Sequence, residues 1–179
     1  MCRRLGGGME IIMNIPADEQ IMSLAKKVLA FAGHDYTPEQ LTEIPKILAT
    51  KNKYWWCVDM QLWDMMPEVY VEPFEFYSNG HKVPVKDIAD QVKRASTVCD
   101  DSMVPIHMGH NPIVQFTGEK TARVLTRLND YHTYKDDDST YEGWAFYVDD
   151  FVKCDDGVWR IQTLRLTYRK ILGALRTQG

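Results

Sequence analysis

The sequence predicts an α+β domain, because helical patterns dominate its first half and an antiparallel meander fills its second. Apolar residues recur at helical spacing between residues 16 and 98, with one extended stretch among them. Four extended stretches separated by turn sequences then occupy residues 104–171. The 179 residues suffice for one core without disulfides or metals. We expect a flexible arm at residues 1–15 and a single domain at 16–179.

Helices are expected over residues 16–33, from residue 37 to about 48, and over residues 53–66. Thr37 is the N-cap of the second, with Pro38 at its first position and Gln40 in the capping-box position. Pro45 is expected to kink or divide it. The third is apolar over more than half its circumference and is interrupted by Asp59. An unpaired buried carboxylate is costly, so this acid either has a partner, faces a wet pocket, or ends the helix.

The extended stretches define the sheet. A strand is predicted over residues 69–77, where Pro73 indicates an edge or a bulge, and an amphipathic helix follows over residues 85–98. Strands are then predicted over residues 104–116, 120–134, 142–153 and 158–171, with turns between them. Strands joined in this order form an antiparallel meander.

The first hairpin of the meander brings a histidine and a carboxylate together. If Gly118 and Glu119 are the central turn residues, His107 and Asp130 lie at equal distances from the turn and face each other. Directly opposed side chains have Cβ atoms about 4.5–5.5 Å apart. A carboxylate at this distance orients an imidazole and favours its protonated form. A β-bulge in the hairpin would shift this register.

Strand alternation separates the two histidines of the His107-Met108-Gly109-His110 motif. The His107 face is expected to hold Ile113, Val124 and Leu128. The opposite face is expected to hold His110 together with Met108, Val114 and Phe116. Because zinc needs three or four convergent ligands and no third one is recognised, we expect no metal site and no cofactor. The other histidines, which are His34, His81 and His132, lie in loop or strand-end contexts and give no signal.

Composition and motifs exclude several functional classes. The net charge of −4 gives non-specific nucleic-acid binding no electrostatic support at the level of the whole chain. The basic residues near the C-terminus leave a localised patch as an alternative, but a solvated basic tail is the favoured interpretation; they are Arg165, Arg169, Lys170 and Arg176. No run approaches the roughly 18 apolar residues of a membrane span, and no secretory signal is recognised, so a cytoplasmic protein is expected. The G-x-S-x-G, Walker A and G-x-G-x-x-G motifs are absent. What remains is a histidine with carboxylate neighbours and many aromatic residues, which suits cofactor-free proton transfer on a hydrophobic organic substrate.

The meander with a histidine at its start and Gly157-Val158-Trp159-Arg160-Ile161 on its last strand resembles the SnoaL-like branch of the nuclear-transport-factor-2-like superfamily. The similarity covers roughly residues 45–172 and is greatest to bile acid 7α-dehydratases, with scytalone dehydratases more distant. Its other motifs are Lys53-Tyr54-x-x-Cys57-x-Asp59-x-x-x-Trp63-Asp64, Tyr77-Ser78-Asn79-Gly80, the His107 motif, and Ala145-Phe146-Tyr147-x-Asp149. The resemblance implies helices on a curved, mostly antiparallel sheet that forms a cone with an internal pocket, often in a homotrimer.

The resemblance also implies site residues. The predicted catalytic group comprises His107, Asp59, Tyr54 and Asp130. Tyr54 and Asp59 are five residues apart, about 140° on an ideal helix, so they share a pocket only if it is wide or the helix ends near Asp59. The predicted substrate-binding group comprises Tyr77, Arg169, Trp63, Trp144 and Tyr147. The resemblance also implies a pocket arginine on the last strand. Counting from Trp159 places it at Tyr168, and the local Tyr-x-Arg-Ile pattern places it at Lys170. Arg169 lies between these two positions and is our choice.

These expectations define a function. The predicted activity is that of a hydro-lyase, which removes water by histidine-mediated β-elimination from a small, hydrophobic cyclic, polyketide-like or steroid-like substrate. His107 takes the proton, Asp130 or Asp59 holds its tautomer, and Tyr54 donates a hydrogen bond to the substrate carbonyl. The alternatives are an isomerase or cyclase that uses the same proton abstraction, and a non-catalytic ligand-binding domain. The outer sheet face with Met108, Val114, Phe116 and Leu125 is the expected subunit interface.

Overall fold

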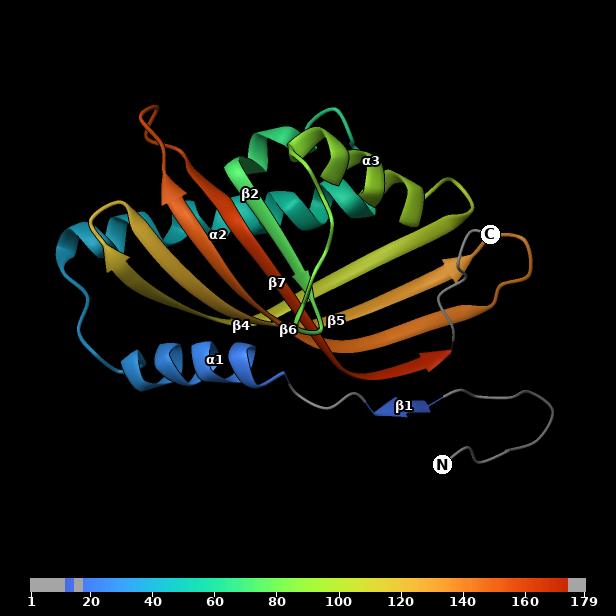
Figure 1. Cartoon of the computed structure of the whole chain (residues 1–179), viewed down its shortest axis with the longest axis horizontal. Helices are drawn as coiled ribbons and strands as arrows, with labels where there is room; N and C mark the ends of the chain where they lie inside the picture. Colours follow the sequence, from blue (N-terminus) through green and yellow to red (C-terminus); the bar gives the residue numbers. More distant parts are fainter. Residues whose placement is uncertain (1–11, 15–17, 174–179) are drawn as a thin grey trace.

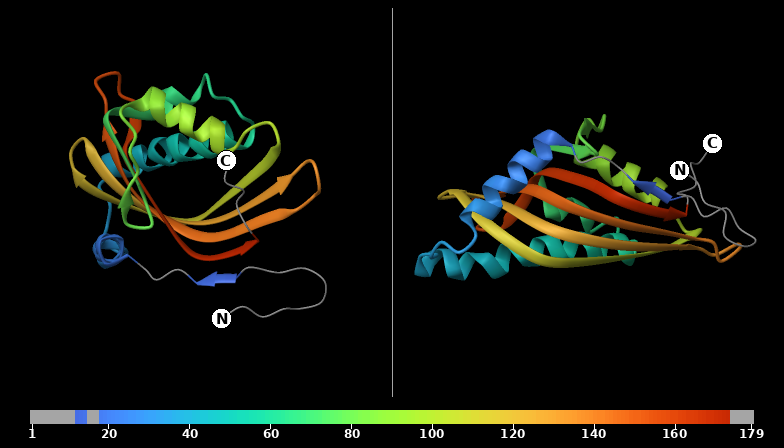
Figure 2. Two further views of the ribbon diagram at one scale, coloured as in Figure 1. Left: turned by 45° about the vertical axis from the view of Figure 1, so that its right-hand side comes forward. Right: turned by 90° about the horizontal axis from the view of Figure 1, so that it is seen from below.

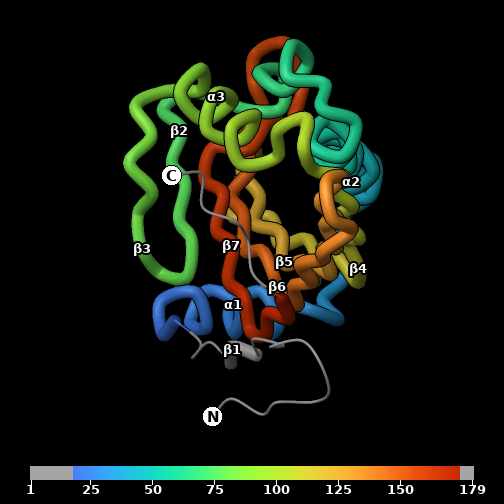
Figure 3. The backbone as a smooth tube through the Cα atoms, turned by 90° about the vertical axis from the view of Figure 1, so that its right-hand side faces the viewer, coloured from blue at the N-terminus to red at the C-terminus, as the bar shows by residue number. Residues whose placement is uncertain are grey.

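The computed structural model describes residues 12–14 and 18–173, and it confirms the α+β fold. In that part of the chain, three α-helices pack on a curved, mixed sheet with the strand order β3-β2-β7-β6-β5-β4. The helices α2 and α3 lie in the hollow of the sheet, and α1 lies against its outer face (Figures 1 and 2). The sheet stays open, with β4 at one edge, as Figure 3 also shows.

The predicted strands are all present, and most pairs are antiparallel. Their bounds are β1 (Ile12–Asn14), β2 (Tyr70–Ser78), β3 (His81–Lys82), β4 (Met103–Gly118), β5 (Thr121–Tyr134), β6 (Thr140–Lys153) and β7 (Trp159–Gly173). Among the strands of the described residues, the β2–β7 pair alone is parallel. The prediction of a free arm at residues 1–15 is wrong for residues 12–14, because β1 pairs with residues 170–172 of β7. Residues 1–11 and 15–17 lie outside the described part.

The helices differ from the prediction in one respect. Their bounds are α1 (Glu19–Phe31), α2 (Pro38–Asp59), the short 3-10 helix η1 (Met66–Val69) and α3 (Ile88–Val98). The Thr37 capping box forms as predicted, but α2 continues through Pro45 and includes the first half of the predicted third helix, residues 53–59. Pro45 has no N–H to donate to the Leu41 carbonyl. This loss is tolerated because Leu41 lies in the exposed first part of α2, where water can reach that carbonyl. None of the helices in the described ranges is long and apolar enough to cross a membrane.

The main core lies between α2, α3, η1 and the hollow of the sheet. Its fully buried members include Ile47, Met66, Phe151 and Ile161. A second, smaller cluster lies on the outer face, where Ile21, Ala25 and Val148 pack with Leu125 and Phe146. The outer face that was expected to bury a subunit interface is therefore partly covered by α1.

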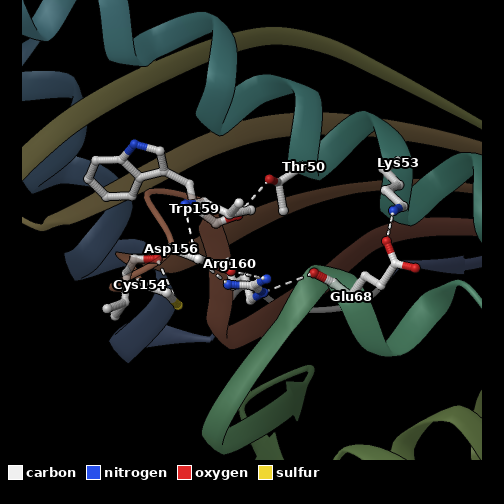
Figure 4. A network of polar contacts seen from close by, with 9 residues as sticks. Thr50, Lys53, Glu68, Cys154, Asp156, Trp159 and Arg160 are labelled. Atoms are coloured by element: carbon white, nitrogen blue, oxygen red, sulfur yellow. Dashed lines mark hydrogen bonds and ion pairs between the residues drawn. The ribbon is translucent and has the colours of Figure 1, made fainter.

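A polar network holds α2 and η1 against the start of β7 (Figure 4). The Thr50 hydroxyl donates to the Trp159 carbonyl at 2.6 Å. The Arg160 guanidinium forms two hydrogen bonds with Asp156, at 2.9 and 2.7 Å, and donates to the Glu68 carbonyl at 3.2 Å. Lys53 pairs with the Glu68 carboxylate. These contacts fix the direction of α2 across the sheet and so determine where its last residue lies.

The β4–β5 hairpin has the predicted pairing at the histidine but not at the turn. Gly118 pairs with Thr121, so the turn lies one residue later than expected. Two register shifts in β4, between Phe116 and Gly118 and between His110 and Ile113, offset this difference. His107 therefore faces Asp130 as predicted.

The second register shift reverses the faces of the residues beyond it. Val114 is buried in the main core and Phe116 packs against it, so the prediction that they lie on the outer face is wrong. Ile113 was expected on the His107 face but borders a groove on the outer side, beside α1. One extra residue in a strand moves every later side chain to the other face. Asn111, with a φ of 52°, lies within this bulge.

Candidate active site

The candidate site is organised around an Asp59–His107 pair. The Asp59 Oδ1 lies 2.6 Å from His107 Nδ1, and the side chains of Asp59 and His107 are 15% and 8% exposed. The same carboxylate accepts the His107 backbone N–H, at 3.1 Å to Oδ1 and 2.9 Å to Oδ2. A carboxylate on Nδ1 places the proton on that nitrogen and leaves Nε2 free to accept one. The pair is thus arranged as an oriented base.

The pair forms because a helix end meets a sheet edge. Asp59 is the last residue of α2, and Gln61 turns the chain away with a φ of 54°. His107 lies on β4, the edge strand, so its N–H can point toward α2 and away from β5. This makes His107 and Asp130 a non-hydrogen-bonded pair, the kind in which facing side chains lie closest.

On the β5 side of His107 lies a second carboxylate with a different partner. Asp130 is fully buried, and its Oδ2 accepts the Tyr168 hydroxyl at 2.5 Å. Gly143 makes room for both, because a Cβ there would lie 2.1 Å from Asp130 Oδ1 and 2.5 Å from the Tyr168 ring. Burial raises the pKa of the Asp130 carboxyl, against the opposite effects of the Tyr168 hydrogen bond and of His107. The side chain that reaches Asp130 from the last strand is thus Tyr168, whereas our choice was Arg169.

His132 completes this group, although the sequence interpretation assigned it no role. It is 4% exposed, and its ring centroid lies 5.3 Å from that of His107 in an edge-on arrangement. Burial, together with a smaller effect of the nearby His107, lowers the pKa of His132 to about 3, so its ring is neutral at ordinary pH. Strand alternation contained the missing signal, because residue 132 lies two places from Asp130 and therefore on the same face.

Tyr54 lies deeper in the core, in an aromatic group on the same side of the sheet. Its ring contacts those of Tyr70 and Tyr147, with centroids 6.2 and 6.3 Å away. Beside it, Lys51 Nζ lies 2.7 Å from Asp149 Oδ2 and 3.4 Å from the centroid of the Tyr147 ring. Burial raises the pKa of Tyr54, so it is a neutral hydrogen-bond donor at ordinary pH.

The remaining predicted residues do not converge on His107. The Tyr77 hydroxyl donates to Glu75 at 3.1 Å on β2, and Trp63 packs at the edge of the main core. Trp144 and Arg169 border the groove on the outer face beside α1. Tyr77, Trp144 and Arg169 are therefore separate from the Asp59–His107 pair.

The pair borders a groove between the end of α2 and β4. Its volume is about 620 Å³, and Asp59 and His107 both border it. Its other walls are largely apolar and include Trp55, Trp56, Met60, Ile106 and Met108. Trp56 and Met60 are 62% and 60% exposed, which is unusual for such large apolar side chains.

The comparison with protein families agrees with this architecture. A sequence model of the SnoaL-like domain matches residues 39–165, which is most of the chain and includes α2, η1, α3 and the whole β4–β6 meander. The chain belongs to the SnoaL-like family.

Solved structures with the SnoaL-like fold resemble the chain at low sequence identity. A protein from Novosphingobium aromaticivorans, provisionally assigned as a scytalone dehydratase, has 19% identity and a TM-score of 0.67 over 78% of this chain and 91% of its own. The hexachlorocyclohexane dehydrochlorinase LinA-type3 from Novosphingobium barchaimii has 14% identity and a TM-score of 0.66, over 78% of this chain and 95% of its own. At this level of identity the likeness establishes the fold.

The buried His132 of this SnoaL-like domain predicts a specific pH dependence. With a folded-state pKa of about 3 and an unfolded value near 6.5, the unfolded chain binds a proton that the folded protein excludes. Stability should therefore fall as pH drops from about 6.5 toward about 3, by at most about 1.4 kcal/mol per pH unit. Asp130, with its raised pKa, opposes this effect at the acid end.

His132→Gln should make this acid slope shallower. Urea unfolding at pH 7 and pH 5 measures it as the difference in the free energy of unfolding. The exposed His110→Gln serves as the control and should keep the slope of the unmodified protein. Equal slopes in all three proteins would contradict the assignment of His132 as a neutral buried histidine.

Proposed function

We propose that the protein is a lyase that eliminates water from a hydrophobic β-hydroxy carbonyl compound, with His107 as the base. The observation that supports this proposal most is the 2.6 Å contact between Asp59 Oδ1 and His107 Nδ1. This hydrogen bond occupies Nδ1 and leaves Nε2 free to accept a proton. The apolar groove beside the pair fits a cyclic or polyketide-like substrate better than a charged one. Two structural neighbours also bear the names of elimination enzymes, a dehydratase and a dehydrochlorinase.

The proposed reaction returns every group to its starting state. His107 Nε2 takes the proton from the carbon next to the carbonyl, and the C–H electrons form an enolate. The enolate then forms the C=C bond as the β C–O bond breaks, and the leaving hydroxyl takes the proton from the imidazolium and departs as water. Asp59 holds the imidazole in place and stabilises its charge throughout.

Two further roles belong to this proposal. The family resemblance gives Tyr54 the role of donor to the enolate oxygen. It lies in the core, where Lys51 Nζ is 4.6 Å from the centre of its ring, and it does not border the groove. Asp130 does not hold His107 Nδ1, which is taken by Asp59; its raised pKa suits it instead to assist the leaving hydroxyl. The homotrimer and the cytoplasmic location stay predictions.

The test uses a panel of cyclic and polyketide-like β-hydroxy ketones and esters in D₂O. A dehydratase yields a conjugated product that has lost one water by mass spectrometry. An isomerase or cyclase exchanges the carbon-bound proton for deuterium without losing water, and a ligand-binding domain binds without exchange. Either of these results across the panel would overturn the dehydratase assignment.

A further inference from the structure

The candidate site contains a cluster of three side chains, one of which, His132, has no part in the proposed proton transfer. His107, Asp130 and His132 each offer one nitrogen or carboxylate oxygen, and these three atoms all lie within 4.8 Å of one another. Asp130 and His132 are buried, on the same face of β5, and His107 faces them from β4. Two imidazoles and one carboxylate are a recurrent ligand set for divalent transition metals.

We propose that this cluster is a zinc-type metal site, in which a divalent transition-metal ion binds His107, Asp130 and His132 and blocks proton transfer by His107. The binding site stands independently of any reaction. Only the inhibitory consequence rests on the proposed function, because an ion on Nε2 would occupy the lone pair that the base uses.

The hydrogen bonding of the three side chains supports this ligand set. His107 Nδ1 is bound to Asp59 at 2.6 Å, which leaves Nε2 as its free nitrogen. Metal-bound histidines commonly have a carboxylate on their other nitrogen, which fixes the ring and raises its basicity. Asp130 Oδ1 and His132 Nδ1 are both buried and have no hydrogen-bond partner. Such unpaired buried atoms are rare and costly, and a bound ion would satisfy both.

The geometry requires only modest side-chain rotation. Zinc bonds of about 2.0–2.2 Å place tetrahedral ligand atoms about 3.3–3.6 Å apart, while the three atoms here lie within 4.8 Å. Tyr168 holds the other Asp130 oxygen at 2.5 Å and so keeps Oδ1 available. Three protein ligands leave the fourth position open to water. The nitrogen ligands disfavour Mg²⁺ and Ca²⁺, which prefer oxygen.

The binding test uses Co²⁺ as a visible probe and Zn²⁺ in competition. The purified full chain should bind one Co²⁺ with d–d absorption, which Zn²⁺ abolishes and Mg²⁺ leaves unchanged. Asp130→Asn and His132→Ala should each weaken binding by at least about 10–100-fold. His110→Ala, which removes an exposed histidine of the same motif on the other face, should bind as the unmodified protein does. Binding that survives both ligand variants would overturn the proposal.

A second measurement protects the test against variants that do not fold. Anomalous diffraction from zinc-soaked crystals of the unmodified protein should place the ion between the three side chains. Zinc found only elsewhere, or bound nowhere, would overturn the site. If zinc binds there and the protein eliminates no water from any substrate, the metal site stands and the proposed lyase fails. If turnover is found, inhibition by zinc that a chelator reverses supports the block, and unchanged turnover with zinc bound overturns it.

Discussion

Replacing His107 by alanine is expected to lower kcat/KM for elimination by about 10²–10⁴-fold or more, with the fold intact. The imidazole is the group whose Nε2 is left free by Asp59, and the variant leaves no base in that position. Folding should survive because the backbone N–H that bonds Asp59 remains. Steady-state kinetics, with the melting temperature as the folding check, measures both effects.

His110→Ala is the matched control for that variant. It removes the other histidine of the same motif, which is exposed and lies on the outer side of the sheet. Because His110 also borders the groove beside the pair, KM can change, but kcat should equal that of the unmodified protein. Turnover by His107→Ala at the unmodified rate would remove His107 from the mechanism, and an equal loss in both variants would point to a general effect on the motif.

The largest loss of stability is expected from Lys51→Met. Lys51 and Asp149 form an ion pair at 2.7 Å, and their side chains are 2% and 1% exposed. Removing one partner of a buried pair leaves an uncompensated charge and typically costs about 3–5 kcal/mol. Burial already lowers the pKa of Lys51 to about 8 and raises that of Asp149, which shows how strongly the site disfavours single charges. Urea unfolding measures the change in the free energy of unfolding.

The control is Lys53→Met, on the same helix. Lys53 pairs with Glu68 at the surface, where the side chains are 34% and 62% exposed, so the loss should stay below about 1 kcal/mol. Adding Asp149→Asn to Lys51→Met should recover part of the loss, because the unpaired charge is then removed. A loss in Lys51→Met no larger than that in Lys53→Met would show that the pair contributes little.

Much of the fold could be predicted because its signals are local. The Thr37 capping box, the apolar periodicity of the helices and the turn sequences between strands each involve residues a few positions apart. These signals located the four long strands to within two or three residues and identified the meander. The pairing of His107 with Asp130 was also predicted, although the shifted turn and the two bulges had to offset each other.

The sequence by itself therefore determined the α+β class, the SnoaL-like resemblance and His107 as the central candidate. Only the tertiary structure decided which carboxylate binds Nδ1, that His132 and Tyr168 join the group, and that Val114 turns inward. The reason is physical. A bulge depends on how the whole hairpin packs, and the end of α2 reaches β4 only because contacts distant in sequence orient the helix across the sheet. Such long-range contacts leave no periodic pattern in the chain, whereas caps, turns and strand alternation do.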